Sequence, residues 1–574
     1  MRARLWTPLA LIFLISSVYA PFLGSRFVRT AGDEKVYVSQ AIEMERDHRW
    51  FVQTLQDEPN YYKGPLHYVL LRAGMKTFGR NPWAALYMNF FLLLGGALAL
   101  ASVVRKRYPE WIGGDVWTGA AFALCTGVYS HTFASQMEIE LAALFAVGVW
   151  LLDRLKPKDA GWAFWCLTGI MGWVKSPLHS AFLGTSAILF ALSQGELKTR
   201  LKNPKAWLAV ALGVAVCIAG YLPPYFLDRQ NFWDAYIIRE TLRKSDGSGQ
   251  DWSVAVVSTF GFYLFPWILL ALVAYAQTLF QFPKLWKTPA TRRLLCLGFS
   301  LFLPSVLFFI WHVYRFENYN LPVISGVWIW IAAVWGLNQY KTQTQRLSRW
   351  QKAYAGALGL TGVIFLLLPV AVTLLFQHFA PMPVWWPHWL LALIWIGSLL
   401  SSFGFLYFGF WQKGQRPDFL ALSSAGLLWA LGGLFVVIGE REMIDLRNYI
   451  DQAHTQGRTV SLGYYNLNHN IWSEWGYLNF WVGHEVHGIH SPEKLKEALE
   501  RGDTILVSAK ENGVQDFRDF IAKNEPQLKL RFIPWKRWRT RGQGDSGKPL
   551  WQEAWERRDL SLLEVDYFIV EPLR

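Results

Sequence analysis

The sequence predicts a polytopic α-helical membrane protein that ends in a small α/β domain. Of the 574 residues, 53% are hydrophobic and only 17% are charged, which disfavours a disordered, fibrous or ordinary soluble chain. Aromatic residues make up 16% of the chain and include 32 Trp, and Trp and Tyr favour the bilayer interface. Short basic segments between long apolar runs complete the pattern of a chain that crosses a membrane many times.

The transmembrane segments are predicted from apolar runs of roughly 17 to 25 residues, the length that crosses about 30 Å of hydrocarbon. We expect about thirteen spans on this basis. They begin near Pro8, Pro82, Gly113, Ile139, Trp162, His179, Trp207, Val254, Leu294, Leu321, Ala353, Trp389 and Phe419.

The basic residues indicate how these spans are oriented. The formal net charge is +14, but the Lys and Arg side chains lie in short loops rather than on one face of a soluble domain, so no nucleic-acid partner is expected. With a cytoplasmic N-terminus, alternation places every strongly basic short loop on the cytoplasmic side, as the positive-inside rule requires. These loops are 105–107, 154–158, 198–205, 284–293, 341–352 and 413–416.

An odd number of spans places the C-terminal part on the opposite side, which we take as the periplasm of a cell with an inner membrane. The membrane module is predicted over residues 1–440, with a first periplasmic loop at 25–81, and residues 441–574 are predicted to form a periplasmic α/β domain. Within that domain, Ser491-Pro492-Glu493 is typical of a helix start, with Ser as the N-cap and Pro at the first helical position.

No disulfide framework or cysteine-based metal cluster is expected. The four cysteines, Cys125, Cys166, Cys217 and Cys296, all fall inside apolar segments, where they offer neither loop staples nor a metal cluster. Carboxylates in the first loop leave a divalent cation open as a cofactor, because such side chains are the oxygen ligands that hard cations prefer.

Adjacent carboxylates open the first periplasmic loop. Asp33 and Glu34 directly follow the first span, and a carboxylate there can accept a proton from a hydroxyl, orient an acceptor or bind a cation. The alternative is a solvated helix start, since Asp and Glu also favour the first helical turn.

A lysine among aromatic residues marks the point where the same loop returns to the membrane. Lys63 lies in the run Tyr61-Tyr62-Lys63-Gly64-Pro65 and supplies the compact positive charge that a phosphate group needs. Taken alone, the run is also consistent with an interfacial belt of lysine and aromatic side chains.

Several motifs follow one another in a characteristic order. The first loop contains Asp33-Glu34-x-x-Tyr37, Lys63-x-Pro65-Leu66-x-Tyr68 and Phe78-Gly79, and later segments contain Glu138-x-x-Leu141, Lys175-Ser176-Pro177, Phe265-Pro266-Trp267 and the run from Arg315 to Pro322. Together these motifs resemble the aminoarabinose transferase-like family. Its members are GT-C glycosyltransferases, related to the protein O-mannosyltransferases, that use polyprenyl-phosphate-linked sugars.

Three positions depart from the family pattern. Lys63-Gly64-Pro65 stands where the family usually has Lys-Pro-Pro, Glu138 where Asp is common, and Arg315 where Lys is frequent. The charge is retained at all three positions, whereas the reach of the carboxylate and the rigidity of the turn are not.

The resemblance implies a polytopic GT-C fold and an inner-membrane glycosyltransferase that faces the periplasm. The donor would be a sugar on a polyprenyl phosphate, and the acceptor would be lipid A or another glycolipid, a glycan or a protein. A single displacement predicts inversion at the anomeric carbon. The implied catalytic carboxylates are Asp33, Glu34 and Glu138; the implied donor-phosphate ligands are Lys63, Arg243 and Arg315; and the implied substrate contacts are Tyr37, Tyr62, Tyr319 and Lys175.

Two other functions compete with this interpretation. A transporter or flippase of lipid-linked saccharides would place polar or ionisable groups along a path through the bilayer, but such residues are scarce in the middle of the predicted spans. If the chain were a structural protein of the envelope, the order of the carboxylate and cation motifs would be accidental.

Overall fold

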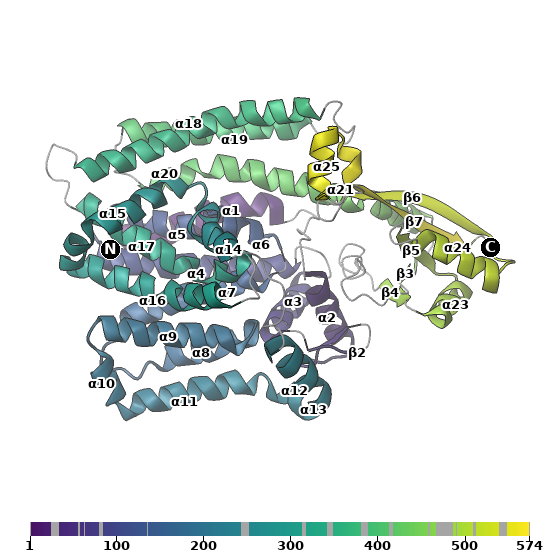
Figure 1. Cartoon of the computed structure of the whole chain (residues 1–574), viewed down its shortest axis with the longest axis horizontal. Helices are drawn as coiled ribbons and strands as arrows, with labels where there is room; N and C mark the ends of the chain where they lie inside the picture. The colour runs from purple at the N-terminus through teal and green to yellow at the C-terminus, as the bar shows by residue number, and fades with distance from the viewer. Residues whose placement is uncertain are drawn as a thin grey trace.

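The computed structural model describes residues 2–23, 34–55, 58–61, 63–79, 84–134, 136–242, 252–312, 317–340, 348–379, 388–411, 417–456, 460–465, 486–489, 491–508, 513–538 and 548–572. Long helices lie side by side in a bundle, and a mixed sheet flanked by helices extends from one end (Figure 1). We call this end of the bundle the domain end.

Seven helical segments of the described part are long and apolar enough to cross a membrane. They are α4 (Ala84–Arg107), α15 (Ile268–Lys287), α16 (Pro289–Trp311), α17 (Ile324–Tyr340) with the turn before it, α18 (Arg349–His378), α19 (His388–Leu406) with the turn after it, and α20 (Pro417–Ser423) with the start of α21 (Ala425–Thr455). Shorter apolar helices include α1 (Arg2–Leu23), α8 (Trp162–Val174), α9 (Pro177–Ser193), α11 (Pro204–Ala219) and α14 (Trp252–Phe260). The chain is therefore a multi-helix membrane protein, and the total of about thirteen spans stays a prediction.

Indole rings fill the centre of the bundle. Trp117 of α5 (Gly114–Leu124) is fully buried, with its ring centroid 4.7 Å from that of Trp335 and 5.7 Å from that of Trp328. Both pairs meet edge to face, the geometry that aromatic quadrupoles favour. Not every Trp of this chain therefore serves the membrane interface, and these rings instead join α5 to α17.

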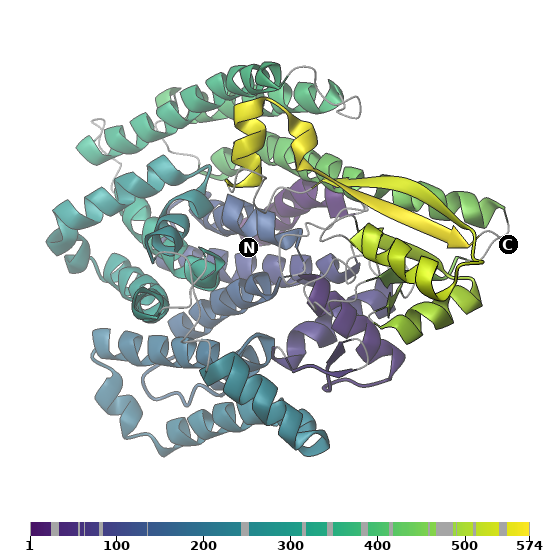
Figure 2. The ribbon, with the colours of Figure 1, turned by 45° about the vertical axis from the view of Figure 1, so that its right-hand side comes forward.

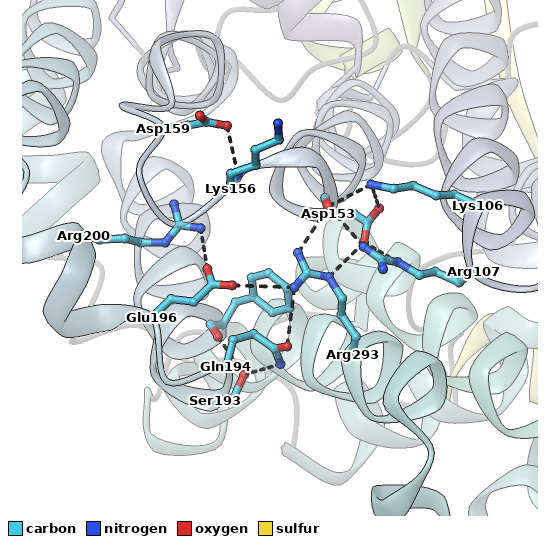
Figure 3. Close-up of polar contacts among 11 residues, drawn as sticks. Lys106, Arg107, Asp153, Lys156, Asp159, Ser193, Gln194, Glu196, Arg200 and Arg293 are labelled. Atoms are coloured by element: carbon cyan, nitrogen blue, oxygen red, sulfur yellow. Dashed lines mark hydrogen bonds and ion pairs between the residues drawn. The ribbon is translucent and has the colours of Figure 1, made fainter.

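The helix α7 (Met137–Arg154) carries a buried carboxylate at its last turn. Asp153 accepts hydrogen bonds from Lys106 at 3.0 Å, from Arg293 at 3.3 Å and from Arg107. Figure 3 shows how these three cations converge on it from the ends of α4 and α16. Its side chain is only 1% exposed, so the single acid ties three helices together at the end opposite to the domain end.

The same cluster continues to the segment after α9. Arg293 also lies 3.8 Å from Glu196, which pairs at 2.7 Å with Arg200 of α10 (Leu197–Leu201) (Figure 3). Four of the basic residues that the sequence placed in cytoplasmic loops thus share two carboxylates.

Short elements between the spans gather at the domain end. The first loop forms α2 (Glu34–Arg46), β1 (Thr54–Leu55), β2 (Glu58–Pro59) and α3 (Pro65–Phe78). Beside it lie α12 (Leu222–Leu227), α13 (Arg229–Phe232) and the π-helical turn η1 (Trp233–Leu242) (Figure 1). Val52 and Tyr61 of the first loop pack with Phe232 and Tyr236 of this second segment.

The C-terminal region contains a five-stranded mixed sheet in the order β4-β3-β5-β7-β6. Its strands are β3 (Leu462–Tyr465), β4 (Val486–Ile489), β5 (Thr504–Ser508), β6 (Leu530–Trp538) and β7 (Glu564–Pro572). β3 is parallel to β4 and β5, whereas β7 is antiparallel to β5 and β6.

The two faces of this sheet serve different cores. On β5, Ile505 and Val507 pack with Leu495 of α23 (Pro492–Arg501) and Phe517 of α24 (Gly513–Asn524). Leu506 between them belongs to the core of the bundle, together with residues of α21 such as Leu446 and Ile450. Successive side chains of a strand point to opposite faces. Ile505 and Val507 therefore face α23 and α24, whereas Leu506 packs on the other side, where it joins the sheet to α21. Figure 2 shows α21 passing behind the strands.

A local sequence signal accounts for the start of α23. The Ser491 side chain accepts a hydrogen bond from the backbone N–H of Lys494 at 3.2 Å, and Pro492 occupies the first helical position. The sequence prediction of this helix start is confirmed.

We expect Asp153→Asn to destabilise the bundle, because three cations would lose the charge of their shared carboxylate. Removing one partner from a buried ionic network typically costs about 3–5 kcal/mol. Because water partly solvates the exposed Lys106 side chain, we expect a loss near the lower end of this range. The measurement is the thermal unfolding midpoint of the purified protein in detergent. Asp159→Asn, at an exposed carboxylate in the nearby 155–161 turn, is the matched control and should leave the midpoint unchanged.

Candidate functional site

The clearest polar cluster at the domain end surrounds the first turn of α7. Glu138 accepts a hydrogen bond of 2.6 Å from the ammonium group of Lys175, which lies in the turn between α8 and α9. The two side chains are only 5% and 13% exposed. A charge removed from water to this extent needs a partner, so the pair fixes the α8–α9 turn against α7.

Two further side chains of this cluster come from the 3-10 helix η4 (Glu317–Val323). The Lys175 ammonium lies 4.4 Å from the ring centroid of Tyr319, a cation–π contact. Asn318 donates a hydrogen bond of 3.1 Å to the same Glu138 oxygen that Lys175 contacts. Three residues predicted from separate motifs, Glu138, Lys175 and Tyr319, therefore meet in one place.

The first loop reaches the same turn through its backbone. The Gly64 N–H donates to the Lys175 carbonyl at 3.3 Å, and the Gln53 amide donates to the Lys63 carbonyl at 3.0 Å. Lys63 itself is buried, with 8% of its surface exposed. Lys63 is therefore adjacent to the Glu138 and Lys175 cluster, although more than seventy positions separate it from either residue in the sequence.

Gly64 allows this approach. A Cβ atom on Gly64 would lie 2.2 Å from the carbonyl oxygen of Trp173, far inside van der Waals contact. The backbone angles of Gly64, φ −63° and ψ 156°, are accessible to any residue, so the lack of space explains the glycine. A proline here would also lose the N–H that bonds to Lys175, which accounts for the departure from Lys-Pro-Pro at this position.

His179, which the sequence analysis named only as the start of an apolar span, is a member of the cluster. It is buried on the first turn of α9, with its Nδ1 3.3 Å from the Ser176 hydroxyl, and it experiences the charges of Lys175, Glu138 and Lys63. Its position at a helix start beside Lys175-Ser176-Pro177 was the available signal.

A second buried pair joins the first loop to the same first turn of α7. His67 of α3 lies 2.6 Å from Glu140, and neither side chain is exposed. The Tyr37 ring packs edge-on against His67 at 5.1 Å and against Tyr68 at 6.1 Å. The predicted substrate contact Tyr37 is thus part of the packing that holds α2 on α3. Sequence reasoning missed the His67 and Glu140 pair, because nothing in the local pattern links the two residues.

A tyrosine connects the first loop to the segment after α12. The Tyr61 hydroxyl donates to the Asp228 carboxylate at 3.1 Å. Burial, together with the neighbouring negative charge of Asp228, raises the pKa of the Tyr61 phenol above its ordinary value, which keeps the hydroxyl protonated as a donor. The two segments that flank the cluster are thereby joined.

Other predicted site residues lie outside the described residues. These are Asp33, Tyr62, Arg243 and Arg315, and Glu34 begins α2 without a described side chain. Their roles stay predictions. Among the residues that the structure does describe, no group of three His, Cys, Asp or Glu side chains is arranged to hold a metal ion.

A bundle of apolar helices with loop elements and a mixed sheet at one end is the architecture of the GT-C membrane fold, and solved structures share this fold with the chain. The particular likeness is to ArnT from Cupriavidus metallidurans. Its crystal structure bound to undecaprenyl phosphate superimposes with a TM-score of 0.65 at 15% sequence identity and covers 98% of each chain. Its apo structure gives a TM-score of 0.62 at 17% identity, over 99% of this chain and 98% of that one.

Sequence comparison agrees with the structural likeness. Residues 58–222 match the family described as dolichyl-phosphate-mannose-protein mannosyltransferase. This segment runs from β2 through α3, α7 and the Lys175 turn into α12, so it includes most of the described cluster. None of the curated proteins compared with the chain matches it. The resemblance that the ordered motifs indicated is confirmed.

We expect Gly64→Ala to separate the first loop from the α8–α9 turn, because the new methyl group would occupy the space of the Trp173 carbonyl. Overpacking of this kind typically costs about 1–3 kcal/mol. Hydrogen exchange of peptides covering residues 60–70 should increase. Gly95→Ala, at a glycine of α4 with nothing within 4 Å of an added Cβ, is the control and should leave that exchange unaltered.

A double-mutant cycle should show that Glu138 and Lys175 stabilise the protein as a unit. Lys175→Met alone leaves a buried carboxylate unpaired and is expected to cost about 3–5 kcal/mol. Glu138→Gln combined with Lys175→Met should cost less than the sum of the single changes, as coupled residues do. Thermal unfolding in detergent measures the coupling, and additive effects would show that the two side chains act independently.

Proposed function

We propose that this chain is a membrane glycosyltransferase that moves a sugar from a polyprenyl-phosphate donor to an acceptor at the periplasmic face of the inner membrane. The observation that carries the proposal is the convergence of Lys63, Lys175 and Glu138 at one end of a fold shared with ArnT. The ArnT crystal structure bound to undecaprenyl phosphate supports a polyprenyl-linked donor. In this proposal residues 1–440 form the transferase module, and residues 441–574 form the periplasmic domain.

The location of the cluster suits such a donor. The polyprenyl tail would remain in the lipid, and the phosphate would lie near the headgroups at the domain end. An acceptor oxygen attacks the anomeric carbon, the bond from that carbon to the phosphate oxygen breaks, and the phosphate leaves with its additional negative charge. Fixed cations close to that oxygen stabilise the charge as it develops. Lys63, Arg243 and Arg315 are assigned this task.

The carboxylates divide into two roles. Asp33 takes the proton if the acceptor is a hydroxyl, and it positions the acceptor if the nucleophile is an already ionised phosphate, as in lipid A modification. Glu138 already holds Lys175 and Asn318, which supports a role in ordering the site around the acceptor. Tyr62 and Tyr319 donate hydrogen bonds to sugar or phosphate, and a single displacement inverts the anomeric centre.

Asp33→Asn and Lys63→Ala test this assignment. Each should reduce sugar transfer from a polyprenyl-phosphate donor by about 100-fold or more, since positioned proton acceptors and charge-stabilising groups typically contribute this much. The assay follows labelled sugar in membranes that contain equal amounts of correctly inserted protein. Lys76→Ala, at an exposed lysine of α3, is the control and should retain full transfer.

Wild-type transfer by the Asp33→Asn protein would overturn the catalytic assignment. Mass spectrometry of envelope glycolipids and glycoproteins from cells with and without the gene identifies the sugar and the acceptor. If no glycan changes while a lipid-linked saccharide accumulates on one side of the membrane, the transporter alternative is favoured.

A further inference from the structure

One helix of the C-terminal region leaves its own sheet and reaches the bundle. α25 (Leu550–Arg557) lies in the connection between β6 and β7, and both views place it beside the end of α18 (Figures 1 and 2). The Trp555 indole stacks on His378, with centroids 4.5 Å apart, and meets the Phe379 ring edge-on at 5.5 Å. A His378 ring nitrogen also lies 3.2 Å from the Trp555 carbonyl oxygen.

This contact follows directly after a helical segment that is long and apolar enough to cross a membrane. That span of α18 runs from Arg349 to Leu375. His378 follows the end of that span by three residues, which is about 4.5 Å along a helix. We therefore expect α25 to lie near the depth of the lipid headgroups rather than in bulk water.

The exposed surface of α25 combines indole rings with ion pairs. Trp551 and Trp555 are one turn apart and are 59% and 45% exposed. The cations beside them are paired with carboxylates of the same helix: Lys548 lies 2.7 Å from the exposed carboxylate of Glu556, and Arg557 lies 2.5 Å from the buried carboxylate of Glu553. Trp551 and Trp555, four positions apart, lie on one side of the helix, and exposed indole rings at the end of a membrane span are typical of segments that lie in the membrane interface.

Other exposed indoles lie at the domain end of the bundle. Trp311 at the end of α16 is 91% exposed, and Trp389 at the start of α19 is 53% exposed. Both belong to spans that meet the surface at the domain end, the end at which α18 contacts α25. Exposed indoles at the same end of several helices fit a continuous lipid surface better than a single protein partner.

We infer that α25 is an interfacial anchor whose Trp551 and Trp555 side chains insert into the headgroup region of the leaflet at the domain end. Its partner is a phospholipid surface. The C-terminal region is then attached at two separate points, through α21, which continues from the bundle, and through α25. Two attachments fix the tilt of the sheet relative to the membrane. This inference does not depend on the proposed transferase activity.

The test measures the depth of a nitroxide at position 551. Full-length Trp551→Cys protein is spin-labelled in nanodiscs of phosphatidylcholine with a minority of phosphatidylglycerol. Power saturation should show greater accessibility to oxygen than to a water-soluble nickel chelate. Glu497→Cys, at an exposed position of α23, should show the reverse. The unsubstituted chain, labelled in parallel, corrects for the four native cysteines.

Two outcomes would overturn the inference. One is a label at 551 that is as accessible to the chelate as the label at 497. The other is a label that stays shielded in lipid-free amphipol, which would show that protein rather than lipid covers it. A second variant keeps the test decisive if labelling perturbs α25: Trp551→Glu should raise hydrogen exchange in β6 and β7 several-fold in nanodiscs, and Trp551→Phe should not. Equal exchange in all three proteins would equally exclude the anchor.

Discussion

The bundle depends on buried carboxylates of α7 that must keep their cationic partners. Glu138 is held by Lys175 at the domain end, and Asp153 is held by Lys106, Arg107 and Arg293 about 22 Å away along the helix. An unpaired charge at either depth would be expensive, because the surroundings cannot solvate it. The partners come from α4, α16 and the α8–α9 turn, so these two sets of contacts fix the positions of the helices around α7.

The candidate site follows from this constraint. Once Glu138 fixes Lys175, the turn that carries it presents its backbone to the first loop, and Gly64 lets that loop approach without a side chain in the way. His67 and Glu140 then secure the loop on the same turn of α7. Charged groups are thereby gathered before any substrate arrives, and such preorganisation is the form in which fixed charges act most strongly on a developing phosphate charge.

Particular residues show how far prediction reached. The motifs that contain Glu138, Lys175 and Tyr319 indicated one site, and the three side chains do meet. The contact between Tyr61 and Asp228, which are 167 positions apart, and the pair of His67 and Glu140, which are 73 apart, left no trace in any local pattern. The interior position of Trp117 was not predicted either, because composition alone associates Trp with the membrane interface. Such pairings arise only when distant segments pack together.

The sequence by itself determined what depends on short stretches of chain. Apolar length defined the long spans, and Ser491 with Pro492 defined the start of α23, because hydrocarbon thickness and unpaired backbone N–H groups act on neighbouring residues. Tertiary structure decided which carboxylate holds which cation, why Gly64 replaces a proline, and where α25 lies. Each of these depends on distances between segments remote in sequence, and those distances exist only in the folded chain.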